Sequence, residues 1–284
     1  MSEFTNLTER QRSCIPDVHF DLIPIRNLVS NQNYQRDLSE SHIMKTLQDF
    51  DIFQINPVKV SHRNGQNYVF DGQHTIEMIA SVSDSRDTPV WCMVYENLTY
   101  EEEAHIFAEQ QKHVKSLVPI EMFIAHMEAG DNMQMMIHSL VTNVYKLQIS
   151  KKHAPGTISA VSALEFIFEH YGYETLDRTL RLALGTWEGD PISLTSGMLK
   201  GIAMIISAYG DSLDDETFKD HVGRYSAKAI SRNAKDRRPG IIGFAEAMVI
   251  VYNGKNKRHL SLKKLYWNNG RKTGKAPPDY ETEN

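Results

Sequence analysis

Residues 68–75 read Tyr-Val-Phe-Asp-Gly-Gln-His-Thr, and the apolar run Ile-Glu-Met-Ile-Ala follows at residues 76–80. This stretch predicts a short strand that ends at Asp71 and passes through a glycine directly into a helix. A helix that begins at such a turn leaves several backbone N–H groups pointing the same way, and these can hold a phosphate or a carboxylate. Asp71 and His74 could add acid, base or metal chemistry. A tight turn in which Asp71 or Thr75 caps the helix is an equally good interpretation.

The segments on both sides of this turn predict a small α/β domain. Apolar residues indicate four strands, at residues 19–30, 57–63, 67–70 and 90–95. Pro24 interrupts the first strand, and Asn64-Gly65 indicates a hairpin between the second and third because both positions tolerate positive φ. An amphipathic helix is expected from Ser39 onward. The expected order is therefore strand, helix, hairpin, helix, strand.

From Thr99 onward, apolar residues recur at the three-and-four spacing of helices. The expected helices cover residues 100–112, 119–129, 133–144, 159–170, 176–184, 195–208 and 214–234. Four glycines lie where helices are expected to stop, namely Gly130, Gly172, Gly185 and Gly210. Residues 248–252, Met-Val-Ile-Val-Tyr, are the candidate strand of this half.

These patterns predict an α+β protein in which an α/β domain precedes a mostly helical one. The expected boundaries are an N-terminal segment at 1–18, the α/β domain at 19–115, a helical domain with a basic C-terminal region at 116–274, and a disordered tail at 275–284.

The composition is that of an ordinary globular protein. The 284 residues are 41% hydrophobic and 24% charged, with a formal net charge of −5. Cys14 and Cys92 are the only cysteines, which excludes a disulfide framework and a cysteine-based zinc site. The sequence has no signal-peptide pattern and no apolar run of the roughly 18 residues that span a bilayer. We therefore expect a cytoplasmic protein that does not contact a membrane.

The net charge hides two regions of opposite sign. Residues 219–275 contain 15 Lys or Arg against three Asp or Glu, whereas residues 1–218 contain 16 basic residues against 30 acidic ones. Basic density of this kind is typical of contact with a nucleic-acid backbone. The alternative is that the basic region neutralises the acidic one or forms a solvated surface.

The basic region provides the candidate nucleic-acid-binding residues. These are Arg224, Lys228, Arg232, Lys235, Arg237, Arg238, Lys255, Lys257 and Arg258. The first four recur every three or four residues and are expected along one helical face, with Tyr225, Ala229 and Ile230 as buried neighbours. Tyr266 and Trp267 are either available for stacking on bases or core anchors.

Three sequence elements resemble the N-terminal domain of the ParB and sulfiredoxin superfamily. They are Asn33-Tyr-Gln-Arg at 33–36, Phe-Asp-Gly-Gln-His-Thr at 70–75, and an acidic segment at 101–107 followed by Leu-Val-Pro-Ile-Glu at 117–121. The elements occur in the order and spacing of that superfamily, and the resemblance covers about residues 19–124. It implies a ParB/sulfiredoxin-like α/β fold. The helical remainder is similar, less distinctly, to extensions of phage and mobile-element ParB-like proteins.

The resemblance also implies a binding site. In this superfamily the strand-to-helix turn cradles nucleotide phosphates, and some members are described as nucleases. The implied nucleotide or phosphate ligands are Arg36, Gly72, Gln73, His74 and Thr75. A nucleotide and Mg²⁺ are the implied cofactors.

Two positions depart from the family pattern. Thr75 stands where an arginine typically follows the turn histidine, and Val114 stands where relatives commonly carry a basic residue. Neither side chain can replace the bidentate phosphate contacts of a guanidinium group. We therefore expect the turn to be a binding site first and an active site second.

The leading hypothesis is a ParB-like DNA-binding protein of phage or mobile-element type with a phosphate-binding pocket. One alternative is a nuclease or nucleotide hydrolase in which Asp71 and His74 are catalytic. Glu77 could add a carboxylate to that site, although the sequence favours a surface role for it. Another is a protein–protein interaction module whose pocket has lost its chemistry. DNA and a second copy of the chain are the expected partners, and the scattered histidines predict no dedicated metal cage.

Overall fold

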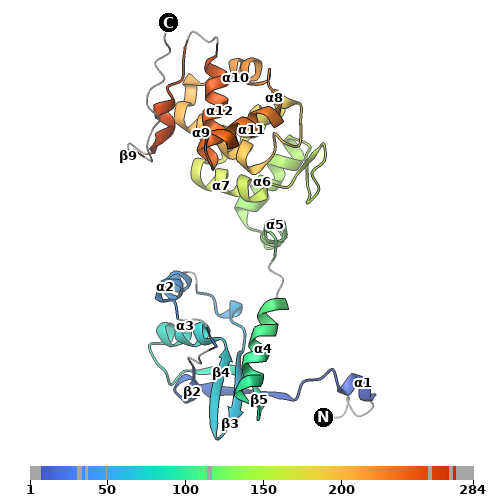
Figure 1. Ribbon diagram of the computed structural model, residues 1–284, viewed down its shortest axis with the longest axis vertical. Helices are drawn as coiled ribbons and strands as arrows, with labels where there is room; N and C mark the ends of the chain where they lie inside the picture. The colour runs from blue at the N-terminus through green and yellow to red at the C-terminus, as the bar shows by residue number, and fades with distance from the viewer. Residues whose placement is uncertain are drawn as a thin grey trace. The chain divides into compact units, whose positions relative to one another are not determined.

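The computed structural model describes residues 8–30, 34–35, 38–48, 50–113, 117–254, 258–268 and 271–272. The chain divides into two compact units, Met1–Lys115 and Ser116–Asn284 (Figure 1). Each unit has a hydrophobic core of its own. The expected tail at 275–284 lies outside the described residues.

The first unit is built on a five-stranded mixed sheet with the strand order β1-β5-β3-β4-β2. Its strands are β1 (Val18–Pro24), β2 (Leu28–Val29), β3 (Val58–Arg63), β4 (Gln66–Asp71) and β5 (Pro89–Glu96). The β3–β4 and β1–β5 pairs are antiparallel, whereas β3–β5 and β2–β4 are parallel. Asn64 and Gly65 have φ values of 50° and 72°, which confirms the predicted hairpin turn.

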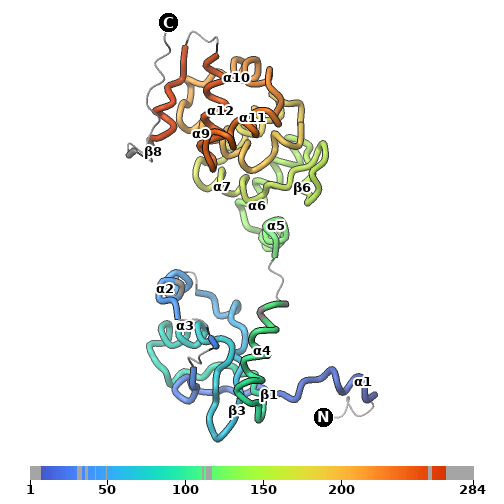
Figure 2. Tube along the Cα trace, in the orientation of Figure 1, coloured from blue at the N-terminus to red at the C-terminus, as the bar shows by residue number. Residues whose placement is uncertain are grey.

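Helices and short 3₁₀ turns complete this unit. They are α1 (Glu9–Arg12), the 3₁₀ turn η1 (Ile25–Asn27) after Pro24, α2 (Glu40–Gln48), η2 (Ile52–Gln54), α3 (Gln73–Ser83) and α4 (Tyr100–His113). The predicted order of strand, helix, hairpin, helix and strand is confirmed, and the break in the first strand falls at Pro24 as expected. The Cα trace in Figure 2 can be followed through the same elements.

Side chains of β3 alternate between the two faces of the sheet, and each face meets a different helix. Val58 and Val60 are buried in the core that also contains Ile76 of α3. Lys59 and Arg63 point to the other face, where they donate hydrogen bonds to Gln110 and Glu103 of α4. The end of β4 therefore lies between α3 and α4.

The second unit is helical. Its helices are α5 (Pro119–Glu128), α6 (Asn132–Ser139), the π-helical turn η3 (Leu140–Val144), α7 (Val161–Tyr171), α8 (Tyr173–Trp187), α9 (Ser196–Tyr209), η4 (Gly210–Ser212), α10 (Asp215–Val222), α11 (Ala227–Arg237), α12 (Ile241–Asn253) and η5 (Leu262–Tyr266). Two-residue strands form two small sheets, β6 (Gln148–Ile149) with β7 (Thr157–Ile158), and β8 (Trp267–Asn268) with β9 (Arg271–Lys272). The predicted α+β class, with a mixed sheet before a helical part, is thus confirmed.

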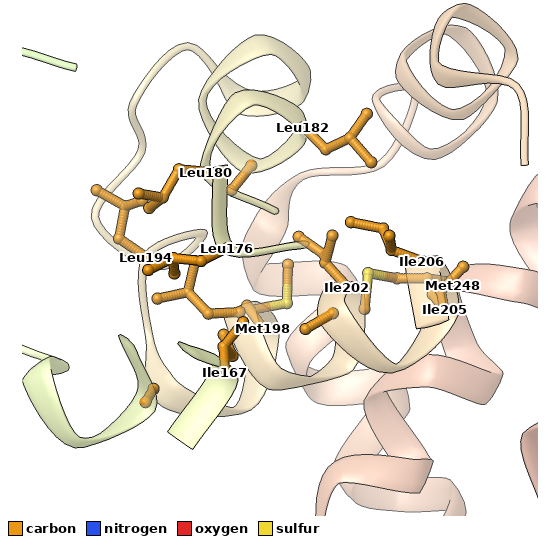
Figure 3. Close-up of a cluster of buried hydrophobic side chains, with 14 of the residues drawn as sticks. Ile167, Leu176, Leu180, Leu182, Leu194, Met198, Ile202, Ile205, Ile206 and Met248 are labelled. Carbon is orange, nitrogen blue, oxygen red and sulfur yellow. The ribbon is translucent and has the colours of Figure 1, made fainter. Parts of the chain in front are cut away.

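Helix α9 lies at the centre of this core. Met198, Ile202 and Ile205 of α9 are fully buried, as is Met248 of α12. Figure 3 shows these side chains together with Leu176 and Leu180 of α8, Ile167 of α7 and other apolar residues. The core forms because α9 carries apolar residues around most of its circumference, so that several helices can pack against it.

Two predicted elements of this unit are wrong. Residues 214–234 do not form one helix, because the chain turns at Gly223–Ser226 and the Ser226 side chain caps the start of α11 by accepting from the Ala229 N–H. Residues 248–252 are helical within α12 and not a strand, since Met248, Val249 and Tyr252 are buried at helical spacing.

Three of the four glycine stops are confirmed, at Gly130, Gly172 and Gly210. Gly185 instead lies inside α8, which continues to Trp187. In the part of the chain that the structure covers, no helix has both the length and the apolar character needed to cross a bilayer.

Candidate functional site

The turn between β4 and α3 has a conformation that glycine favours. Gly72 has φ 100° and ψ 16°, and a Cβ at this position would lie 3.3 Å from both Cα and Cγ2 of Val58. Gly72 is also the N-cap residue of α3, and no side chain makes a capping hydrogen bond there. The alternative in which Asp71 or Thr75 caps the helix is therefore wrong. The first-turn amides of an α-helix have no acceptors within the helix, so this end of α3 can offer N–H donors.

Asp71 is held by Lys59 from the neighbouring strand. Lys59 Nζ lies 3.2 Å from Asp71 Oδ2 and also donates to Gln110 Oε1 of α4 at 2.7 Å. The two side chains are about one-quarter and one-third exposed. The carboxylate predicted as a base or metal ligand thus makes a half-buried ion pair.

The segment that carries the predicted Gln-Arg element is fastened to this turn. Gln35 Nε2 donates to the carbonyl of Val69 in β4 at 2.9 Å, and the Ser39 N–H donates to His74 Nε2 at 3.3 Å. Arg36 itself lies outside the described residues, but chain neighbours on both sides of it contact β4 and α3. Gln35 and Ser39, which flank Arg36 in the sequence, therefore contact the strand and the helix, respectively, on either side of the Gly72 turn.

His74 contributes a structural hydrogen bond. Because Nε2 accepts from the Ser39 N–H, the neutral imidazole carries its proton on Nδ1 in this arrangement. This bond anchors residues 38–39 against the start of α3. This hydrogen bond is the contact that a structural role of His74 requires.

Glu103 of α4 links the third sequence element to the first. Its side chain is fully buried and accepts hydrogen bonds from Arg63 Nε at 2.7 Å and from the Tyr34 hydroxyl at 3.2 Å. Burial, followed by the nearby Glu103 carboxylate, raises the pKa of Tyr34. The hydrogen bond that Arg63 donates to Glu103 raises the pKa of Arg63. Sequence reasoning did not assign Glu103 a role, because a run of three glutamates is usually solvated.

Glu77 does not join Asp71 in a carboxylate site. Both of its oxygens accept from Arg86, each at 2.9 Å. Among the residues that the structure describes, no group of three or more histidine, cysteine, aspartate or glutamate side chains is arranged to hold a metal ion.

Some predicted nucleic-acid-binding residues gather at a groove in the helical unit. The groove has a volume of about 670 Å³. It is lined by Lys228, Ser231, Arg232, Lys235 and Asp236 of α11, Thr195, Ser196 and Gly197 at the start of α9, and Ile192 and Phe244. The residues at the start of α9 were missed from sequence, because they are more than 30 positions away from Lys228 along the chain.

Other residues of the predicted basic set lie elsewhere. Arg224 precedes α11 and pairs with Asp220 at 2.6 Å, so it does not share the α11 face. Arg237 Nε donates to Asn233 at 2.7 Å, and Arg238 Nε lies 3.9 Å from the buried Glu246. Arg258 follows α12, beyond residues 255–257. Lys255 and Lys257 lie outside the described residues.

The predicted aromatic and apolar neighbours need correction. Tyr225 is 51% exposed and Ala229 is exposed, so of the three expected buried neighbours only Ile230 is buried. Tyr266 is buried and donates a hydrogen bond to Glu246, so it is a core anchor and does not stack on bases. The Trp267 side chain is outside the described part of the chain.

Comparison with known proteins gives a match to a family model and matches to ten chains of solved structures. One of these structures is the C-terminally truncated chromosome-partitioning protein ParB from Caulobacter crescentus in complex with CTP-γ-S, at 13% sequence identity and a TM-score of 0.34. The similarity covers 81% of this chain and 99% of that one. No curated protein matches the sequence. The family model matches residues 29–264, which include the β4–α3 turn and the basic groove, and the chain therefore belongs to DUF6551, a family of unknown function.

Proposed function

We propose that this protein is a ParB-like DNA-binding protein whose first unit binds a nucleotide, or a nucleic-acid phosphate, at the β4–α3 turn. The observation that carries the proposal is a pair of contacts that flank Arg36 in the sequence. Gln35 donates to the Val69 carbonyl of β4, and the Ser39 N–H donates to His74 at the start of α3. The turn supplies backbone amides at a helix N-terminus, where partial positive charge favours an anion.

Binding is a better assignment than hydrolysis. Asp71 is paired with Lys59, and Nε2 of His74 accepts from a backbone amide, so both groups predicted as catalytic have structural partners. Thr75 also stands where the family pattern has a second arginine. A site with one guanidinium and a helix N-terminus can hold a phosphate without the additional charge that stabilises phosphoryl transfer.

The test is a nucleotide screen of the full chain by thermal shift, with and without Mg²⁺. A nucleotide that binds the folded state raises the melting temperature by mass action. We expect at least one ribonucleoside triphosphate to do so. Arg36→Ala should raise the dissociation constant of that nucleotide roughly 10- to 100-fold, which is the cost of losing a hydrogen bond between charged groups. Isothermal titration of both proteins measures that change.

Arg26→Ala is the matched control. Arg26 is an exposed arginine of the same unit whose guanidinium pairs with Asp87 in the described structure. Removing it should leave nucleotide affinity unchanged. If no nucleotide shifts the melting temperature at millimolar concentration, or if both variants lose affinity equally, the turn is not the binding site.

A further inference from the structure

The α11 groove is defined by the residues around the 670 Å³ cavity between α11, the start of α9 and Phe244. Its lining contains three cationic side chains and one carboxylate, Asp236, which offsets their charge only in part. Within the described residues, Lys228 and Lys235 have no carboxylate within ion-pair distance. Arg232 has only Asp236, at 4.0 Å, with both side chains largely exposed. By contrast, Arg224 and Arg238 on either side of α11 lie beside carboxylates. The groove therefore has a net positive lining that can attract an anion.

The opposite wall of the groove also favours an anion. It is formed by Thr195, Ser196 and Gly197, where the 14-residue helix α9 begins. No side chain caps this helix, because the Thr195 hydroxyl donates to the carbonyl of Ile192. The partial positive charge of the α9 N-terminus therefore adds to the field of the three cations on α11.

A close contact between α9 and α12 fixes the position of one wall of the groove. A Cβ on Gly197 would lie 2.4 Å from Cζ of Phe244, so the ring of α12 packs directly on the α9 backbone. A Cβ on Gly201, one turn later, would lie 2.6 Å from Cβ of Phe244 and 2.9 Å from Cε of Met248. The start of α9 and the cationic face of α11 are thus positioned by packed helices and not by loops.

The spacing of the cations fits a chain of phosphates better than one small anion. Lys228, Arg232 and Lys235 occupy positions i, i+4 and i+7 of α11 and span about 10 Å along its axis. Phosphates of one strand follow each other at about 3.4 Å along a duplex axis, so the row extends over roughly three phosphates. A single phosphate would engage only part of this row.

We propose that the α11 groove binds the phosphodiester backbone of a nucleic acid. The inference deepens the DNA-binding part of the proposed function and does not depend on nucleotide binding at the β4–α3 turn. Lys228, Arg232 and Lys235 contact successive phosphates, and the α9 N-terminus faces the same strand. Phe244 forms part of the apolar lining beside them.

The test measures binding of the full chain to a fluorescent 30-base-pair duplex and to the single strand of the same length, over a series of salt concentrations. We expect Lys228→Ala/Arg232→Ala/Lys235→Ala to weaken binding at least tenfold. If three phosphate contacts are lost, the slope of log affinity against log salt falls by about 2.7 for duplex or about 2 for single-stranded DNA. The size of this change distinguishes the two forms.

Lys151→Ala/Lys152→Ala/Arg181→Ala is the charge-matched control, because these three side chains are exposed in the same unit and do not line the groove. It should keep wild-type affinity and salt dependence, and circular dichroism should show both variants folded. Equal losses in the two variants, or an unchanged salt slope in the groove variant, would overturn the proposal. So would a mononucleotide that binds the groove as tightly as the oligonucleotides do.

The contributions of the β4–α3 turn and the α11 groove can be distinguished by testing each variant in the assay designed for the other site. Arg36→Ala should retain DNA binding by the groove, and the groove variant should retain any nucleotide-induced thermal shift. Loss of only one activity in each variant assigns each site independently. Loss of DNA binding in Arg36→Ala with none in the groove variant would place the nucleic-acid contact in the first unit.

Discussion

At the scale of single residues, burial decides what Tyr266 and Glu103 do. Tyr266 occurs among lysines and arginines, which suggested stacking on bases, yet its ring is buried and its hydroxyl bonds to Glu246. Glu103 lies in a glutamate run and is nevertheless fully buried between Arg63 and Tyr34. Neither outcome follows from local sequence, because both depend on which distant side chain offers a hydrogen bond.

Tyr266 predicts a loss of stability at alkaline pH. Burial, followed by the hydrogen bond to Glu246, raises the pKa of Tyr266 to about 12. Since an unfolded tyrosine titrates near 10, the contribution of this phenol is complete below pH 10 and declines as the pH rises from about 10 to 12. We expect Tyr266→Phe to make this decline in unfolding free energy shallower, measured by urea denaturation between pH 8 and pH 11.5.

At neutral pH the same variant should lose about 1–3 kcal/mol, because the buried Glu246 loses a hydrogen-bond donor. Tyr225→Phe is the control, since that ring is half exposed and should change neither value. A Tyr266→Phe protein with the wild-type slope above pH 10 would show that this phenol does not contribute to the alkaline loss.

At the scale of elements, helices and strands with regular apolar spacing were predictable, and their interruptions were not. The hairpin at Asn64-Gly65 and the start of α3 followed from turn chemistry that acts over a few residues. The break before α11 depends on the Ser226 cap, and the helical state of residues 248–252 depends on burial against α9. Tertiary packing overrode the strand preference of valine and isoleucine in the second case.

Two helical glycines have different surroundings, and replacing each with alanine should therefore have opposite effects on stability. A Cβ at Gly201 would lie 2.6 Å from Phe244 Cβ and 2.9 Å from Met248 Cε. Gly201→Ala should therefore destabilise the protein by about 1–3 kcal/mol through overpacking. A Cβ at Gly185 in α8 would lie 3.1 Å from Cε of the flexible Lys219 side chain.

Gly185→Ala should be neutral or stabilising by up to about 1 kcal/mol, because alanine has the higher helix propensity. Thermal denaturation of both variants measures the difference. Similar melting temperatures for the two proteins would show that α9 and α12 can separate enough to accommodate a methyl group.

At the scale of the whole molecule, the sequence predicted two kinds of structure in succession, and each unit indeed has its own core. What it could not predict is the α11 groove, since that surface requires the start of α9 to pack beside α11. The turn at Gly72 was predictable because its parts are contiguous. Its partners Lys59 and Ser39 were not, because they come from other elements.

Separate cores predict separate responses to core mutations. Ile76 and Leu180 are fully buried, one in each core. Replacing either with alanine should cost about 2–5 kcal/mol within its own unit. Calorimetry of the full chain should show two transitions, with Ile76→Ala lowering one and Leu180→Ala lowering the other. A single transition that both variants shift equally would contradict independent cores.

Lys59 has a consequence for the approach of a ligand. The residue immediately before the N-cap of α3 is an aspartate, and an isolated carboxylate there would repel any phosphate drawn to the helix. Lys59 acts as a built-in counter-ion 3.2 Å away, so the pair is seen from a distance as a dipole whose field decays faster than that of a single charge. The ion pair thereby largely cancels the repulsion between Asp71 and an approaching phosphate. In the proposed function, the backbone amides of α3 then attract the anion despite the acidic residue beside them.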